Sequence, residues 1–122
     1  MSRVIHFEIN ADNPERAAKF YKDVFGWNIQ KWEGGEPYWL ASTGGKEEPG
    51  IDGAIMPRQH PNASTINTIG VSSVNDYLKK VSASGGKALM EKTAIPGVGY
   101  FTYCQDTEGN QFGIMESDPN AK

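Results

Sequence analysis

The sequence predicts an α+β domain in which two tandem βαβββ modules build a mixed sheet with helices packed on it. Three observations support this fold: an alternating apolar segment near the N-terminus, two amphipathic segments with helix caps, and a second copy of this order of elements about 60 positions later. We expect a single domain over residues 1–122, with module 1 at about 1–57, a linker at about 58–64 and module 2 at about 65–117.

The first module begins with residues 4–9, where branched and aromatic residues alternate with polar ones as in a half-buried strand. Asn13 and Pro14 are typical of a helix start, and Gly26 is typical of a helix end, so a helix is expected over 14–25. Its apolar residues recur at helical spacing and predict packing on a sheet. Three short strands are expected next, at 27–32, 37–42 and 51–56.

The second module has the same order of elements. A strand is expected at 65–72, and Ser73 with Asp76 forms a capping box that starts a helix, which ends near Ser84. Three strands are expected after it, at 87–92, 99–105 and 111–116. A shift of 60 positions places Asn13 on Ser73 and Gly53 on Gly113, so the repeat is one of pattern rather than of identity.

Composition narrows the classes of function. The formal net charge of −3 and the pI near 5.3 argue against a nucleic-acid partner, which needs clustered basic residues. No segment approaches the roughly 20 apolar residues of a membrane span, and the first residues lack the apolar run of a signal peptide. Cys104 is the single cysteine and cannot form an internal disulfide. These features together predict a cytoplasmic protein.

Several motifs resemble those of the vicinal oxygen chelate superfamily, which includes glyoxalase I, extradiol dioxygenases and bleomycin or fosfomycin resistance proteins. They are His6 on the first strand, the segment 14–21 leading to 25–27, and the segments 96–101 and 106–113 near the end. The resemblance covers nearly the whole chain. Thr107 departs from it, because the final turn usually carries proline there. The family fold implies that the two modules form a cup for a small molecule.

The resemblance also implies a site for a divalent metal, bound by one residue on the first and last strand of each module. His6 matches the first of these positions. The other three fall on Ile66, Gly53 and Gly113, whose side chains have no metal-binding atom. We therefore expect no metal cofactor. A one-residue slip in register would bring Asp52 into the cup, and His6, Glu8 and Asp52 form the alternative metal site.

Residues on the cup-facing strands are the candidates for ligand contact. His6 and Glu8 share one face of the first strand and are also candidates for acid and base catalysis. Aromatic rings and the space left by glycines suggest an aromatic or amphipathic ligand. The full set of predicted ligand-binding residues is His6, Glu8, Trp39, Gly53, Tyr100, Tyr103, Gly113 and Met115.

Three functions are compatible with this pattern. The favoured one is a metal-independent protein of the glyoxalase and bleomycin-resistance type that binds a small molecule between its modules. The second is a metal-dependent lyase, isomerase or dioxygenase that uses His6. The third is an accessory or regulatory protein without a small ligand. The resemblance implies a homodimer, and the sequence leaves open whether any reaction is catalysed.

Overall fold

The computed structural model describes residues 2–122, which divide into two compact units. The N-terminal unit comprises His6–Ile66, and the C-terminal unit comprises residues 2–5 together with Asn67–Lys122. Residues 2–5 thus belong to the unit formed mainly by the second half of the chain. The predicted linker at about 58–64 lies within the N-terminal unit. No helix among the described residues is long and apolar enough to cross a membrane.

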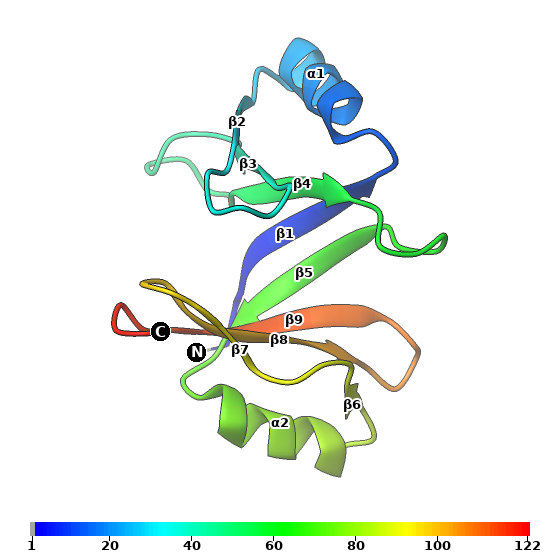
Figure 1. Ribbon diagram of the computed structural model, residues 1–122, viewed down its shortest axis with the longest axis vertical. Helices are drawn as coiled ribbons and strands as arrows, with labels where there is room; N and C mark the ends of the chain where they lie inside the picture. The colour runs from blue at the N-terminus through cyan, green and yellow to red at the C-terminus, as the bar shows by residue number, and fades with distance from the viewer. Residues whose placement is uncertain (1) are drawn as a thin grey trace. The chain divides into compact units, whose positions relative to one another are not determined.

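The elements of the N-terminal unit follow the order of the first predicted module, and those of the C-terminal unit add one strand (Figure 1). The first five are β1 (Val4–Ala11), α1 (Pro14–Phe25), β2 (Asn28–Lys31), β3 (Trp39–Ser42) and β4 (Gly53–Pro57). The remaining six are β5 (Thr65–Gly70), α2 (Val74–Ala83), β6 (Lys87–Ala88), β7 (Thr93–Ile95), β8 (Gly99–Gln105) and β9 (Gln111–Ser117).

In the N-terminal unit the strands pair in the order β2, β3, β4, β1. The β1–β4 ladder is parallel, and the other two are antiparallel. Helix α1 begins at an Asn13 cap, whose side chain accepts from the Arg16 N–H, and ends at Gly26 in a left-handed conformation. Trp27 connects the helix to the sheet, because its ring stacks on Tyr21 at 4.8 Å and packs against Phe7 at 5.8 Å.

In the C-terminal unit β5 pairs with β9 in parallel, and β9, β8 and β6 continue the order. Figure 1 shows α2 running alongside this sheet. The core lies between them around Val74, Cys104 and Ile114, which are at most 2% exposed. The Ser73 hydroxyl caps α2 by accepting from the Asp76 N–H, as the capping pattern predicts.

The strand expected at 87–92 is wrong in its extent. Only Lys87 and Ala88 pair as β6, and a separate strand, β7, follows at Thr93–Ile95 and forms a hairpin with β8. Between them the Met90 carbonyl accepts a hydrogen bond from the Thr102 hydroxyl of β8. The glycine-bearing segment after β7 is the turn of that hairpin, in which Gly97 has a φ of +76°.

The turn between β8 and β9 forms without the proline that the resemblance favours at Thr107. The Asp106 carboxylate accepts from the backbone N–H groups of Glu108 and Asn110 at 2.8 and 2.9 Å. These bonds lower the pKa of Asp106, because they stabilise its charged form. Gly109 completes the turn with a positive φ. Side-chain hydrogen bonding therefore fixes this turn, as in other Asx-type turns.

Candidate functional site

A chain of hydrogen bonds lies on one face of β1 in the N-terminal unit. His6 and Glu8 are two positions apart, so their side chains point to the same side of the strand. The Tyr38 hydroxyl, just before β3, lies 2.8 Å from His6 Nε2 and donates to Glu8 Oε2 at 2.6 Å. Tyr38 therefore joins the two residues that the sequence predicts as a pair.

The direction of these bonds fixes the proton on the imidazole. A tyrosine hydroxyl has one proton, and that of Tyr38 is donated to Glu8. The bond between Tyr38 and His6 must therefore be donated by His6 Nε2. In the neutral ring, Nδ1 is then the unprotonated nitrogen and can accept a hydrogen bond or a proton. The resulting order of donation is His6, Tyr38, Glu8.

Burial determines the charge of this imidazole. It lowers the pKa of His6 below the usual value of 6.5, although the Glu8 and Asp52 carboxylates raise it. Desolvation is the largest of these effects because it penalises the charged form. Glu8 is only 6% exposed and accepts a bond from Tyr38. The native site is therefore built around a neutral histidine at pH 7.

This lowered pKa predicts a pH dependence of stability. Unfolded His6 takes up a proton at higher pH than folded His6, so the free energy of unfolding should fall as the pH drops through and below about 6.5. The effect is at most about 1.4 kcal/mol per pH unit. Urea denaturation at pH 7.5 and 5.5 should show a smaller loss in His6→Gln than in wild type. The exposed His60 provides the control, and an equal loss in His6→Gln and His60→Gln would contradict the prediction.

Gly53 does not lie on the face that carries His6 and Glu8. It pairs with Phe7 in the parallel ladder, and a Cβ built on it would meet the Phe7 ring at 2.6 Å. In a parallel ladder paired residues share a face, so Gly53 points toward the α1 side with Phe7. Ala54 pairs with Glu8 and occupies the position that the sequence assigns to Gly53.

The incorrect face predicted for Gly53 comes from the 60-residue shift that aligns the two modules. In the C-terminal unit Gly113 pairs with Thr68, and a Cβ built on it would meet the Thr68 side chain at 3.1 Å. Thr68 corresponds to Glu8 after the 60-residue shift, and Glu8 pairs with Ala54. The structural equivalent of Gly113 is therefore Ala54, and the shift between the last strands is one residue shorter than the shift between the first strands.

The residues at the family's four metal-ligand positions do not fit a divalent cation. With the corrected register they are His6, Ile66, Ala54 and Gly113, and His6 alone has a ligand atom. Its Nε2 is already bonded to Tyr38. Within residues 2–122 no three His, Cys, Asp or Glu side chains gather closely enough to hold a metal. The alternative set of His6, Glu8 and Asp52 is therefore not assembled.

Two aromatic candidates lie on the helix-facing sides of their sheets. Trp39 pairs with Ile55, which in turn pairs with Ile9, so it lies opposite the face of Glu8. Tyr100 packs against the core that α2 covers, and the Lys92 ammonium lies 4.9 Å from its ring centre. Strand register decides both placements, and the sequence pattern does not reveal it.

The other candidates of the C-terminal unit share a face. Tyr103 pairs with Gly113, and Phe101 pairs with Met115, so these four residues lie on the side of the sheet that faces away from α2. The rings of Phe101 and Tyr103 meet edge to face at 5.6 Å. The candidate ligand-contacting residues on this face are therefore Tyr103, Gly113 and Met115, together with Phe101.

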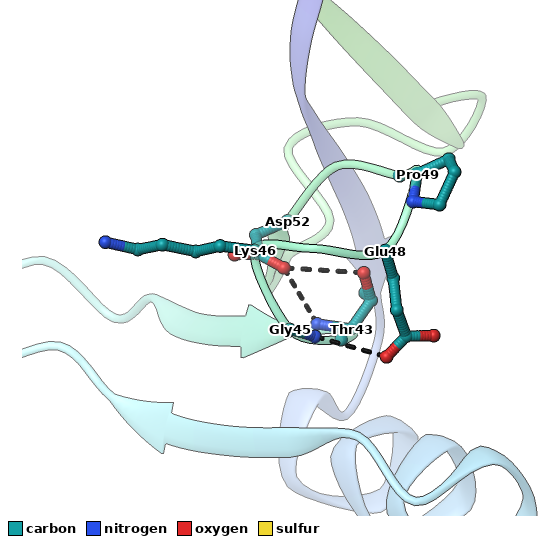
Figure 2. Close-up of a pocket in the computed structure, with 8 residues that line it drawn as sticks. Thr43, Gly45, Lys46, Glu48, Pro49 and Asp52 are labelled. Carbon is teal, nitrogen blue, oxygen red and sulfur yellow. Dashed lines mark hydrogen bonds between the residues drawn. The ribbon is translucent and has the colours of Figure 1, made fainter.

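Two hollows lie in loops of the N-terminal unit. Asp52, which lines the first, raises the pKa of His6, and Trp32, which lines the second, contacts Tyr38. The first, of about 270 Å³, is lined by residues of the β3–β4 loop, including Thr43 and Asp52. Figure 2 shows Asp52 bonded to Thr43 there, with the Lys46 side chain pointing away. The second, of about 260 Å³, is lined by residues 31–33 and 35–37, and its Trp32 ring meets Tyr38 at 6.0 Å.

Cys104 has no sign of a catalytic role. Its side chain is fully buried in the core beneath α2, and burial raises the pKa of the thiol. A thiol with a raised pKa forms little of the nucleophilic thiolate at neutral pH. Cys104 is therefore a buried strand residue of the core.

Solved structures share this fold, and several of them are methylmalonyl-CoA epimerases. The methylmalonyl-CoA epimerase of Mycobacterium tuberculosis is 16% identical, with 95% of this chain and 88% of the other covered and a TM-score of 0.69. A methylmalonyl-CoA epimerase in complex with methylmalonyl-CoA and NH4+ is 13% identical, with coverages of 100% and 99% and a TM-score of 0.71. At these identities the similarity establishes the fold alone.

Sequence comparison gives the family. A glyoxylase-like domain-containing protein of Didymella fabae is 31% identical over 112 residues, which cover 88% of each chain. The family model described as Glyoxalase/Bleomycin resistance protein/Dioxygenase superfamily matches residues 3–114. The resemblance drawn from the sequence motifs is confirmed, and the chain belongs to the glyoxalase, bleomycin resistance protein and dioxygenase superfamily.

Proposed function

We propose that this protein binds a small organic molecule without a metal and that the ligand contacts the chain of His6, Tyr38 and Glu8. The observation that carries the proposal is the bond from His6 Nε2 to Tyr38. It occupies a nitrogen of the one residue that matches the family's metal ligands, and the lowered pKa keeps the ring neutral. The buried Glu8 then serves as the acceptor at the end of a polar chain rather than as a metal ligand.

The superfamily supports a small ligand, because the epimerase structure with methylmalonyl-CoA holds one on the same fold. In that view, Tyr103, Gly113 and Met115 are further candidates for contact, since they share a face with the Phe101 ring. Acyl-CoA thioesters belong in any test panel for this reason. The neutral Nδ1 of His6 also allows proton transfer to a bound ligand, so a metal-free reaction is the second candidate function.

The test is a thermal-shift panel on tag-free protein, with acyl-CoA thioesters, aromatic metabolites and antibiotics as probes, repeated after treatment with a chelator. We expect saturable binding with one site per chain, unchanged by the chelator, and at least tenfold weaker in His6→Gln. The control, His60→Gln, should bind as wild type. Binding that needs zinc, nickel, iron or manganese, lost with the metal in His6→Gln, would overturn metal independence. No binding across the panel would favour an accessory role.

A homodimer in the cytoplasm completes the proposal. Helix α1 has no buried residue, and Phe20, Val24 and Phe25 are 56%, 56% and 61% exposed on it. An apolar helix surface of this kind is commonly covered by another protein surface. Sedimentation velocity of wild type and of Phe25→Glu tests it, and a wild-type protein that stays monomeric at high concentration would contradict the dimer.

A further inference from the structure

Three side chains follow one another on the same face of β1. His6, Glu8 and Asn10 stand at alternate positions of the strand, and all belong to the N-terminal unit. Neighbouring side chains on one face of a strand lie about 7 Å apart, so a ligand along the strand can reach more than one of them. Asn10 plays no part in the chain of His6, Tyr38 and Glu8.

Asn10 has a buried acceptor without a donor. The residue is 5% exposed, and its Nδ2 donates to the Ser64 carbonyl at 2.7 Å. Its Oδ1 is buried and has no hydrogen-bond partner. The orientation of the amide is fixed, because exchanging its oxygen and nitrogen would place Oδ1 against the Ser64 carbonyl oxygen. Buried polar atoms are nearly always bonded, so this oxygen requires an explanation.

The neighbouring groups on this face are acceptors as well. His6 donates through Nε2 to Tyr38, which leaves Nδ1 as the acceptor of the neutral ring. Glu8 accepts from the Tyr38 hydroxyl. The Asp52 carboxylate acts on the same imidazole and adds a further negative charge nearby. The face therefore offers hydrogen-bond acceptors and negative charge.

We infer that the ligand presents O–H or N–H donors to β1 and that Asn10 Oδ1 accepts one of them, so that Asn10 selects hydroxyl or amine ligands over ligands that lack a donor. Carboxylate groups are excluded from this face, because Glu8 and Asp52 repel them and a carboxylate has no proton to donate. This inference rests on the proposed function and names the chemical class of its ligand.

The test uses phenyl, naphthyl and indole probes, each with a side chain ending in an alcohol, its methyl ether, an amine or a carboxylate. Dissociation constants are measured by NMR titration of labelled protein, following the Asn10 side-chain NH2 signal. We expect the alcohol and the amine of the best ring to bind about tenfold more tightly than the ether and the carboxylate, and to shift that signal. The alcohol and ether comparison needs no substitution.

The Asn10→Leu variant should bind alcohol and ether equally. The control is Asn28→Leu, at an exposed position of β2, which should keep the tenfold preference. Failure of every ring in all four forms to bind would contradict the proposed function. Two results would overturn this inference and leave the proposed function standing. The first is equal binding of the alcohol and the ether by the wild-type protein. The second is binding that leaves the Asn10 signal unshifted, which would show that a buried water alone satisfies Oδ1.

Discussion

Gly53→Ala is expected to lower the free energy of unfolding by about 3 kcal/mol. The added Cβ would overlap the backbone carbonyl oxygen of Phe7 and lie 2.6 Å from its ring. A carbonyl in the β1–β4 ladder cannot move without breaking the hydrogen bonds beside it. The reduced entropy of the unfolded chain offsets less than about 1 kcal/mol of this loss.

Gly113→Ala is the control, because the 60-residue shift aligns Gly113 with Gly53 although the strand pairing places it with Ala54. Its added Cβ would meet the Thr68 hydroxyl oxygen at 3.1 Å, which a small side-chain rotation relieves. We expect a loss below about 1 kcal/mol. Urea denaturation of both variants measures the difference. Equal losses would show that the one-residue offset between the two ladders is wrong.

Tyr38→Phe should lower the free energy of unfolding by about 2 kcal/mol. The substitution keeps the ring, with its contact to Trp32, and removes the hydroxyl that links His6 to Glu8. Each partner then loses a hydrogen bond in a partly buried setting, where replacement by water is incomplete. Tyr77→Phe is the control, since its hydroxyl accepts from an exposed Ser2, and less than about 0.5 kcal/mol is expected.

A double-mutant cycle separates the network from simple loss of packing. Glu8→Leu removes the acceptor at the end of the chain, so Tyr38→Phe should cost less in that background than in wild type. The two losses should differ from additivity by at least about 1 kcal/mol. Additive losses in urea denaturation would mean that Tyr38 and Glu8 do not act together.

Local sequence signals predict the helices closely. Asn13 with Pro14, and then Gly26, set the bounds of α1, because caps act on the backbone groups of the adjacent turn. Ser73 sets the start of α2 in the same way. These signals lie within a few residues of the element that they determine, so the pattern along the chain is enough to find them.

Local sequence signals of this kind do not predict strand register. At the break before β7, Thr102 bonds the Met90 carbonyl, twelve residues away in the sequence. Tyr38 reaches the site because β3, β4 and β1 align side by side, and it is thirty residues from Glu8. The sequence identifies His6 and Glu8 as a pair but does not reveal that Tyr38 joins them. One-residue differences in register also decide the faces of Gly53 and Trp39.

The division of β1 between the two units affects how the chain assembles. Residues 2–5 belong with Asn67–Lys122, and the Arg3 carbonyl accepts from the Gly70 N–H at 2.9 Å. During synthesis residues 2–5 leave the ribosome long before Gly70 is made. The N-terminal unit, by contrast, is complete in sequence once Ile66 is made. Residues 2–5 must therefore wait for a partner, and the C-terminal unit closes last by taking up a segment that was translated before the whole N-terminal unit.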